Sequence, residues 1–150
     1  MLAKNDVLAE QNRQWLADRR ILAFNVTLSP GAGKTTLLEH TIRRLGAQRQ
    51  VWVIEGDQET LLDAEMIERA LRALEPDDDS LLFIEYVGNL VCPALFDLGV
   101  HSKVVVISSM FEILAQHARS VNPEVEILPV SATKGDGMEH WFQWIDAHAS

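Results

Sequence analysis

The feature that most constrains the fold is a glycine-rich octapeptide at residues 29–36, with the sequence Ser-Pro-Gly-Ala-Gly-Lys-Thr-Thr. It follows an apolar run at residues 21–28 and opens a helical pattern at residues 35–45. A strand, a glycine-rich turn and a helix N-terminus in this order form a phosphate-binding loop (P-loop), because the loop amides and the helix dipole point at one anion. The octapeptide therefore predicts a site for the phosphates of a nucleotide.

The residue types of this loop suit distinct roles. Glycines 31 and 33 let the backbone curl so that successive N–H groups face the anion. The lysine reaches the terminal phosphates, the first threonine hydroxyl holds Mg²⁺, and the second contacts an inner phosphate. The expected phosphate-binding residues are Pro30, Gly31, Ala32, Gly33, Lys34, Thr35 and Thr36.

The loop departs from the usual G-x-x-x-x-G-K-[ST] pattern at one position. The first glycine of that pattern falls at Leu28, and a residue with a Cβ must make this turn with negative φ or accept strain. The alternative interpretation is that the glycine-rich stretch only caps a helix. The lysine, both threonines and the flanking patterns favour phosphate binding.

Composition excludes several classes of protein. The length of 150 residues predicts one domain, and the net charge of −9 argues against a nucleic-acid partner. We find no apolar run long enough to cross a membrane and no signal-peptide core, so we expect no membrane association. The single cysteine rules out an internal disulfide and fits a reducing, cytoplasmic compartment.

Strand and helix patterns alternate along the chain. An amphipathic helix at residues 5–19 is expected to pack on the domain that follows. We predict a three-layer α/β P-loop fold with helices on both faces of a mostly parallel five-stranded sheet of order 2-3-1-4-5. The predicted strands are residues 21–28, 51–54, 81–86, 103–109 and 125–130, and the remaining helices are 35–45, 61–74, 110–120 and 137–149.

Acidic residues follow two of these strands. Asp57 comes after the second strand and Glu85 closes the third. Either can hold Mg²⁺, directly or through water, and orient an attacking water. The alternative for Asp57 is a helix N-cap, whereas a carboxylate that closes an apolar strand is costly unless it is paired. Gly88 can bring an N–H near the γ-phosphate or be a plain turn glycine.

Cys92 is the only thiol in the chain. A lone cysteine is usually a small buried apolar side chain. The histidines are scattered and none clusters with Cys92, so spacing alone predicts no metal site within one chain.

Several of these segments together resemble the HypB-type nickel-insertion GTPases of hydrogenase maturation. The resemblance begins with Asn5-Asp6 and Asn12-Arg13 and continues through the P-loop. It then includes residues 54–60, 83–85, 87–94 and 96–99, and Ser131-Ala132-Thr133 with the glycines that follow. These motifs run along nearly the whole chain in the order found in the family.

The resemblance implies an activity and a set of ligands. GTP phosphates would bind the P-loop, and Thr35, Asp57 and Glu85 would manage Mg²⁺ and water. Cys92 would bind Ni²⁺ or Zn²⁺ at the interface of a nucleotide-dependent homodimer. A second loop would pack near the guanine base, at Ser131, Ala132 and Thr133. The partners would be a maturation protein and the hydrogenase precursor.

The chain also lacks two segments of that family. The guanine-reading Asn-Lys-x-Asp motif occurs nowhere, and Asp63-Ala64 runs directly into a helical pattern without the family's Cys-His metal motif. Base selectivity should fall, because a site that reads a base edge discriminates mainly through those hydrogen bonds. Nickel binding through Cys92 should be weak, because one thiolate per chain is a poor site.

Two functions of different classes follow. The first is slow Mg²⁺-dependent GTP hydrolysis with relaxed base specificity, in which Lys34, Asp57 and Glu85 are the catalytic residues. The second is a scaffold that binds a nucleotide or a partner and no longer hydrolyses. A small-molecule kinase, suggested only by the strand order, ranks last.

Overall fold

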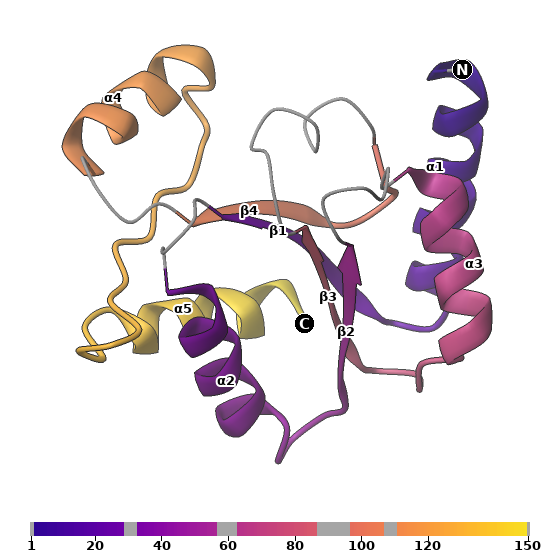
Figure 1. Ribbon diagram of the computed structural model, residues 1–150, viewed down its shortest axis with the longest axis horizontal. Coiled ribbons are helices and arrows are strands. Elements are labelled where there is room, and N and C mark those ends of the chain that lie inside the picture. Colours follow the sequence, from indigo (N-terminus) through magenta and orange to yellow (C-terminus); the bar gives the residue numbers. More distant parts are fainter. Residues whose placement is uncertain (1, 29–32, 57–62, 87–96, 107–110, 150) are drawn as a thin grey trace.

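The computed structural model describes residues 2–28, 33–56, 63–86, 97–106 and 111–149. Strands and helices alternate through most of the described chain (Figure 1). The elements are α1 (Leu2–Asp18), β1 (Leu22–Leu28), α2 (Lys34–Leu45), β2 (Val51–Gly56), α3 (Ala64–Leu74), β3 (Leu81–Tyr86), β4 (Ser102–Val106), α4 (Phe111–Val121) and α5 (Met138–His148).

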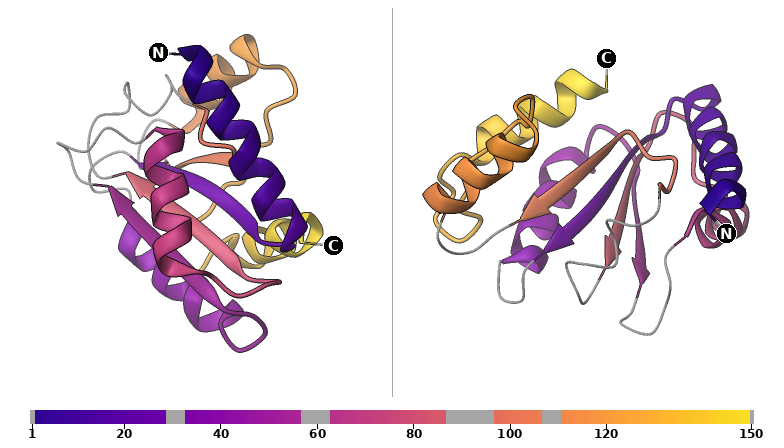
Figure 2. Two further views of the ribbon diagram at one scale, coloured as in Figure 1. Left: turned by 90° about the vertical axis from the view of Figure 1, so that its right-hand side faces the viewer. Right: turned by 90° about the horizontal axis from the view of Figure 1, so that it is seen from above.

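The described strands form a parallel sheet of order β2-β3-β1-β4. Helices α1 and α3 cover one face, and α2 and α5 cover the other (Figure 2). All carboxyl ends of a parallel sheet meet at one edge, so the segments that follow the strands converge there. The predicted α/β class and layer arrangement are confirmed.

Strand β1 is buried on both faces. Leu22, Phe24 and Val26 face the core under α2 and α5, whereas Ala23 faces the core under α1 and α3. Phe24 stacks on Phe83 of β3 with ring centroids 5.6 Å apart. Apolar residues on both faces are what a central parallel strand requires, because each face is covered by helices.

The prediction of a fifth strand at residues 125–130 is wrong for the described chain, whose sheet has four strands. The alternating apolar residues suit a strand, but Pro129 has no N–H to donate to a ladder. A cavity also lies between this segment and β4, so the segment lacks a neighbouring strand. Strand β4 is therefore an edge of the sheet.

Two helix boundaries differ from the predictions for local reasons. Helix α3 begins at Ala64 because the Asp63 carboxylate accepts from the Met66 N–H at 2.9 Å, which makes Asp63 the N-cap. Helix α1 already begins at Leu2. No helix among the described residues has the length and apolar character needed to span a bilayer.

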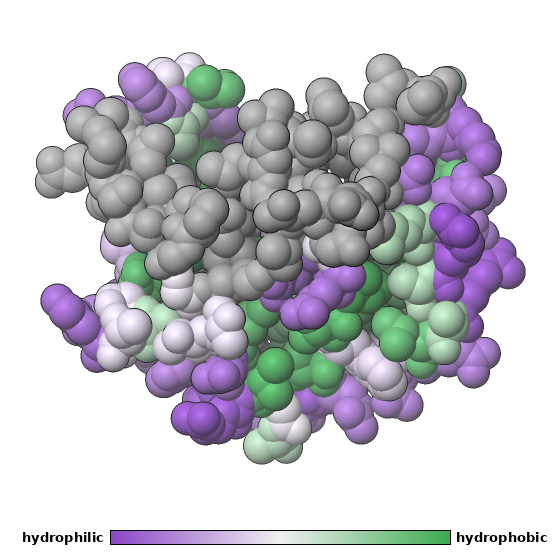
Figure 3. All heavy atoms as spheres, viewed as in Figure 1, coloured by the Kyte–Doolittle hydropathy of each residue, from purple (hydrophilic) through white to green (hydrophobic). Residues whose placement is uncertain are grey.

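The surface is uneven in polarity. On the face seen in Figure 3, polar side chains dominate around α1 and α3, and apolar ones gather between α2 and β2. Strand β2 is the other edge of the sheet, and its first three residues are only half-buried.

Candidate nucleotide-binding site

The junction between β1 and α2 is the centre of the site. Gly33 precedes α2 in the left-handed conformation, with φ 77° and ψ 26°, and no side chain caps the helix. The first helical bond joins the Leu37 N–H to the Gly33 carbonyl at 2.9 Å. Because the earlier N–H groups of the first turn have no capping side chain, the positive end of α2 is available to an anion.

Helix α2 is held firmly below this junction. The Thr41 hydroxyl donates to the Leu37 carbonyl at 2.7 Å and accepts from the Trp141 indole N–H at 2.9 Å. Since Trp141 lies on α5, this buried bond fixes α2 to the neighbouring helix. In the first turn, Thr35 is exposed and Thr36 is half-buried.

Glu85 lies beside this junction. It is the penultimate residue of β3 and is only 2% exposed, and its backbone pairs in register with Val26 of β1 and Glu55 of β2. The strand that enters the P-loop and the strand that carries this carboxylate are thus neighbours. A carboxylate at this strand end can serve as an oxygen ligand for a cation or orient a water molecule.

A cavity of about 560 Å³ opens next to the same junction. Its volume lies within the usual range for small-molecule sites. Gly33 and Leu37 line one side, and the predicted base-loop residues Ser131, Ala132 and Thr133 line it as well. The structure therefore brings the P-loop end of α2 and this loop together around one hollow.

A tight turn shapes the loop that carries these three residues. The Ser131 N–H donates to the Asp136 carbonyl at 2.8 Å, and the Gly135 N–H donates to the Ser131 carbonyl at 2.7 Å. Gly137 then caps α5 at φ 71°, where a Cβ would lie 2.1 Å from the Pro129 carbonyl oxygen. Glycine is needed there for both conformation and space.

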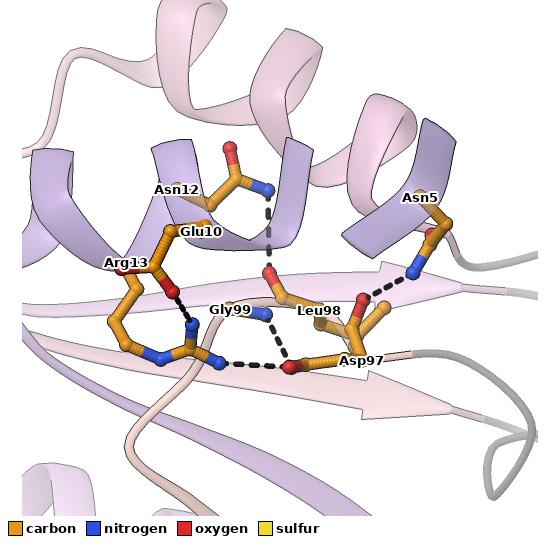
Figure 4. A network of polar contacts seen from close by, with 7 residues as sticks. All are labelled: Asn5, Glu10, Asn12, Arg13, Asp97, Leu98 and Gly99. Carbon is orange, nitrogen blue, oxygen red and sulfur yellow. Dashed lines mark hydrogen bonds and ion pairs between the residues drawn. The ribbon is translucent and has the colours of Figure 1, made fainter. Parts of the chain in front are cut away.

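Helix α1 holds the chain where it returns from two strand ends (Figure 4). The Asn5 side chain donates to the Asp97 carbonyl at 2.8 Å and accepts from the Ala64 N–H at 2.9 Å. Asn12 donates to the carbonyls of Ala64 and Leu98 at 2.9 and 3.2 Å. We name these two side chains the asparagine clip.

Arg13 adds an ion pair to the clip. It binds Glu10 on its own helix and the Asp97 carboxylate at 2.8 Å (Figure 4). Partial burial works to raise the pKa of Asp97, but the Gly99 N–H and Arg13 together hold it below its usual value. Gly99 approaches α1 so closely that a Cβ would lie 2.1 Å from the Ala9 carbonyl oxygen.

The sequence analysis named Asn5 and Asn12 only as part of a resemblance and predicted no contacts for their side chains. Asn5 and Asn12 are seven residues apart, which places both amides on one face of a helix. That spacing was a signal, but their partners lie 52 to 92 residues away and periodicity does not reveal them.

Several predicted site residues lie outside the described part of the chain. Their roles stay predictions, as does that of the Lys34 side chain. They are Pro30, Gly31, Ala32, Asp57, Gly88 and Cys92. Among the described residues, no three His, Cys, Asp or Glu side chains are grouped so that they could hold a metal ion.

The parallel sheet and the glycine-rich junction define the class of P-loop nucleotide-binding proteins. Consistent with this class, residues 22–75 match the family model "CobW/HypB/UreG, nucleotide-binding domain". The chain is 39% identical to the hydrogenase maturation factor HypB of Escherichia coli K12 over 97% of its own length and 70% of that protein. The chain belongs to the HypB family of hydrogenase maturation factors.

Other relatives agree with this assignment. The HypB of Rhizobium leguminosarum bv. viciae is 36% identical over the whole chain and 69% of that protein. The crystal structure of HypB from Archaeoglobus fulgidus superposes with a TM-score of 0.87 at 27% identity, covering 99% of this chain and 100% of that one. HypB from Helicobacter pylori in complex with nickel, at 23% identity and a TM-score of 0.76, shares the fold; the match covers 97% of this chain and 95% of that one.

The alignments also show that this chain is shortened internally. The match to the Escherichia coli protein extends over 202 residues, although this chain has only 150. The relative therefore carries several tens of residues within the matched region that have no counterpart here. This agrees with the motifs that the sequence lacks.

Proposed function

We propose that this chain is a Mg²⁺-dependent GTP-binding and GTP-hydrolysing protein that assists nickel insertion during hydrogenase maturation. The observation that carries the proposal is the uncapped start of α2 behind Gly33, which lies beside the strand end that bears the buried Glu85. Membership of the HypB family supports it. We place the protein in the cytoplasm, as expected for a chain with one cysteine.

The residues fit a magnesium site. Thr35 offers a hydroxyl, and Glu85 and Asp57 offer carboxylates, and these hard oxygen donors are the ligands that Mg²⁺ prefers. When bound, Mg²⁺ neutralises charge on the β- and γ-phosphate oxygens.

The proposed reaction is an in-line displacement by water. Asp57 and Glu85 orient a water molecule whose oxygen forms a bond to the γ-phosphorus, while the bond to the bridging oxygen breaks and GDP leaves. Lys34 and the P-loop amides stabilise the charge that develops on the phosphate oxygens. Gly88 supplies a further N–H to the γ-phosphate. No arginine was identified from the sequence as a finger for this charge, so turnover is slow.

Base specificity is relaxed in this proposal. Ser131, Ala132 and Thr133 contact the base at the cavity, but the chain has no Asn-Lys-x-Asp motif to read a guanine edge. Without those hydrogen bonds, GTP and ATP differ little in binding free energy.

Metal transfer completes the proposal. Cys92 binds Ni²⁺ weakly, or Zn²⁺ in its place, when two chains form a nucleotide-dependent homodimer. The homodimer then acts with a maturation partner on the hydrogenase precursor. Equilibrium dialysis with Ni²⁺ tests the residue, because a Cys92→Ser variant that kept tight uptake would exclude it.

Phosphate release tests the enzymatic part. With GTP or ATP and Mg²⁺, the protein should release phosphate above the level of Lys34→Ala, with the two nucleotides within about tenfold of each other. Lys4→Ala is the matched control, because Lys4 is exposed and forms an ion pair with Glu65, away from the P-loop. Nucleotide binding without turnover would favour the alternative of a non-hydrolysing scaffold.

A further inference from the structure

A chain of buried hydrogen bonds joins the two helices that cover one face of the sheet. Helices α2 and α5 lie side by side there (Figure 1), and the Trp141 indole N–H donates to the Thr41 hydroxyl, which donates in turn to the Leu37 carbonyl. An indole N–H can only donate, so the Thr41 oxygen must accept and its own proton is directed along α2. Thr41 is 0% and Trp141 3% exposed, so water does not compete for these bonds. We name this pair of side chains the helix link.

On α2, the helix link leads to the phosphate end of the site. The Thr41 hydroxyl binds the carbonyl of Leu37, and the Leu37 N–H binds the carbonyl of Gly33 one turn earlier at 2.9 Å. Between Lys34 and Leu45 the helix contains neither proline nor glycine, the residues that most often kink a helix. A tilt of α2 at Thr41 therefore moves Gly33 and the N–H groups at the start of the helix with it.

On α5, the helix link leads to the loop at residues 131–133. Trp141 lies in the first turn of this helix, where its backbone N–H donates to the Gly137 carbonyl at 3.2 Å, and Gly137 packs against Pro129 on the near side of the loop. The Trp141 ring also stacks on Trp144, with centroids 5.6 Å apart and planes inclined by 12°. The indole is thus held on two sides, and its position fixes the start of α5 and the loop before it.

Both ends of this connection line the same cavity. Gly33 and Leu37 belong to its lining, as do residues 131–133 and Trp141 itself. In the proposed function, phosphates bind at the first end and the base at the second. A ligand that spans two subsites binds tightly only when their separation matches its own length.

We propose that Trp141 and Thr41 are positioning residues that fix the phosphate subsite and the base subsite at the separation a nucleotide requires. The inference rests on the proposed nucleotide site and adds to it a determinant of affinity that lies outside the P-loop. The hydrogen bond between these two side chains joins residues 100 positions apart in the sequence, so it forms only in the folded protein.

Calorimetric titration of the full chain with Mg²⁺ tests the proposal by comparing GTP with inorganic tripolyphosphate, which has the phosphates but no base. Thr41→Val keeps the shape of the side chain and removes the hydroxyl. It should weaken GTP binding by about tenfold and tripolyphosphate binding by less than about twofold, because only GTP spans both subsites. Thr41→Ser restores the hydroxyl and should return GTP affinity to near the wild-type value.

A double variant separates position from stability. Thr41→Val leaves the buried indole N–H without its acceptor, which destabilises the fold, whereas Thr41→Val/Trp141→Phe removes both partners and should regain much of the lost stability in urea unfolding. Its GTP affinity should stay low, because the helix link is still absent. Trp15→Phe is the matched control, because Trp15 packs against the apolar cluster on the opposite face of the sheet and its loss should alter neither affinity.

Two results with these variants would overturn the proposal. One is a loss of GTP and tripolyphosphate affinity by the same factor, which would make the pair a general support of the fold. The other is wild-type GTP affinity in both Thr41→Val and the double variant. If the wild-type chain binds GTP no better than tripolyphosphate, the base subsite and this inference fall while the phosphate site stands. If it binds neither, the proposed function falls too.

Discussion

Gly33 combines two properties that matter for phosphate binding. Its φ of 77° is unfavourable for other residues, yet a Cβ there would meet no atom within 4 Å. A Gly33→Ala variant should therefore fold with a stability loss of about 1 kcal/mol, from backbone strain rather than from a clash. It should also bind GTP more weakly, because relaxing the strain turns the first N–H groups of α2 away from the anion.

Calorimetric titration and urea unfolding check this prediction together. Gly135→Ala is the strain-matched control for the loss of stability, because Gly135 has φ 83° and equally open surroundings. Unaltered GTP affinity in Gly33→Ala would show that the α2 N-terminus does not bind the phosphates.

Asn12 illustrates a buried polar residue with a structural task. It is 2% exposed, and its amide donates to two carbonyl groups. Asn12→Ala leaves both carbonyls without this donor and should cost about 1–3 kcal/mol of stability. Urea unfolding measures the loss, and Gln11→Ala, at an exposed neighbouring position, should change stability little.

His101 makes stability depend on pH. Partial desolvation first, then Arg13 and His148, lower the pKa of this imidazole, whose Nδ1 accepts from the Ala23 N–H at 3.2 Å. The pKa of His101 in the folded state lies below its unfolded value near 6.5. The contribution of the neutral imidazole to the free energy of unfolding is therefore complete above pH 6.5, and it is lost as the pH falls through the folded-state pKa.

Thermal unfolding between about pH 7.5 and 5, the range in which histidine titrates, checks whether stability falls on acidification. The wild-type midpoint should fall more steeply on acidification than that of His101→Gln, which keeps an acceptor but does not titrate. Parallel curves for the two proteins would contradict the role of His101.

At the scale of elements, local chemistry predicted what lies close in sequence. The apolar run of β1 and the glycine-rich junction each act within a few residues, so the pattern alone located them. The Asp63 cap is equally local, but the prediction began this helix at residue 61 and missed it. The neighbours of the asparagine clip and the cavity beside β4 depend on chain segments that meet only after folding. Periodicity shows which face of an element is apolar, but not what covers that face.

The segment at residues 125–130 shows this limit most clearly. Its apolar alternation predicts a strand, but Pro129 and the distance of β4 across the cavity remove the ladder. Its amides should exchange with solvent much faster than those of the central strands β1 and β3. Hydrogen exchange of the free protein checks this, and protection equal to that of β1 would mean that the segment pairs with a strand in solution.

At the scale of the whole molecule, nucleotide binding and folding are linked. A ligand that binds only the folded state stabilises it by about 2.7 kcal/mol at a hundredfold excess over its Kd. GTP with Mg²⁺ should therefore raise the thermal midpoint of the wild-type chain, whereas Lys34→Ala should gain much less. Equal shifts in both proteins would place the nucleotide away from the P-loop.

Within the described chain, strand β4 is an edge of the sheet. A buried apolar cluster lies on each face of the sheet, beside β1 and β3. The fold therefore tolerates the absence of the residues that its relatives carry. The parts nearest the phosphates persist, whereas the guanine-reading motif is absent. Loss of selectivity without loss of phosphate binding is the expected result.

The asparagine clip has a mechanical consequence. Asn5 and Asn12 bind the chain where it resumes after β2, at Ala64, and where it resumes after β3, at Asp97 and Leu98. A protein that grasped α1 and shifted it by a fraction of a helical turn would displace both points in one movement. Helix α1 thus offers a single handle on the chain that follows β2 and on the chain that follows β3.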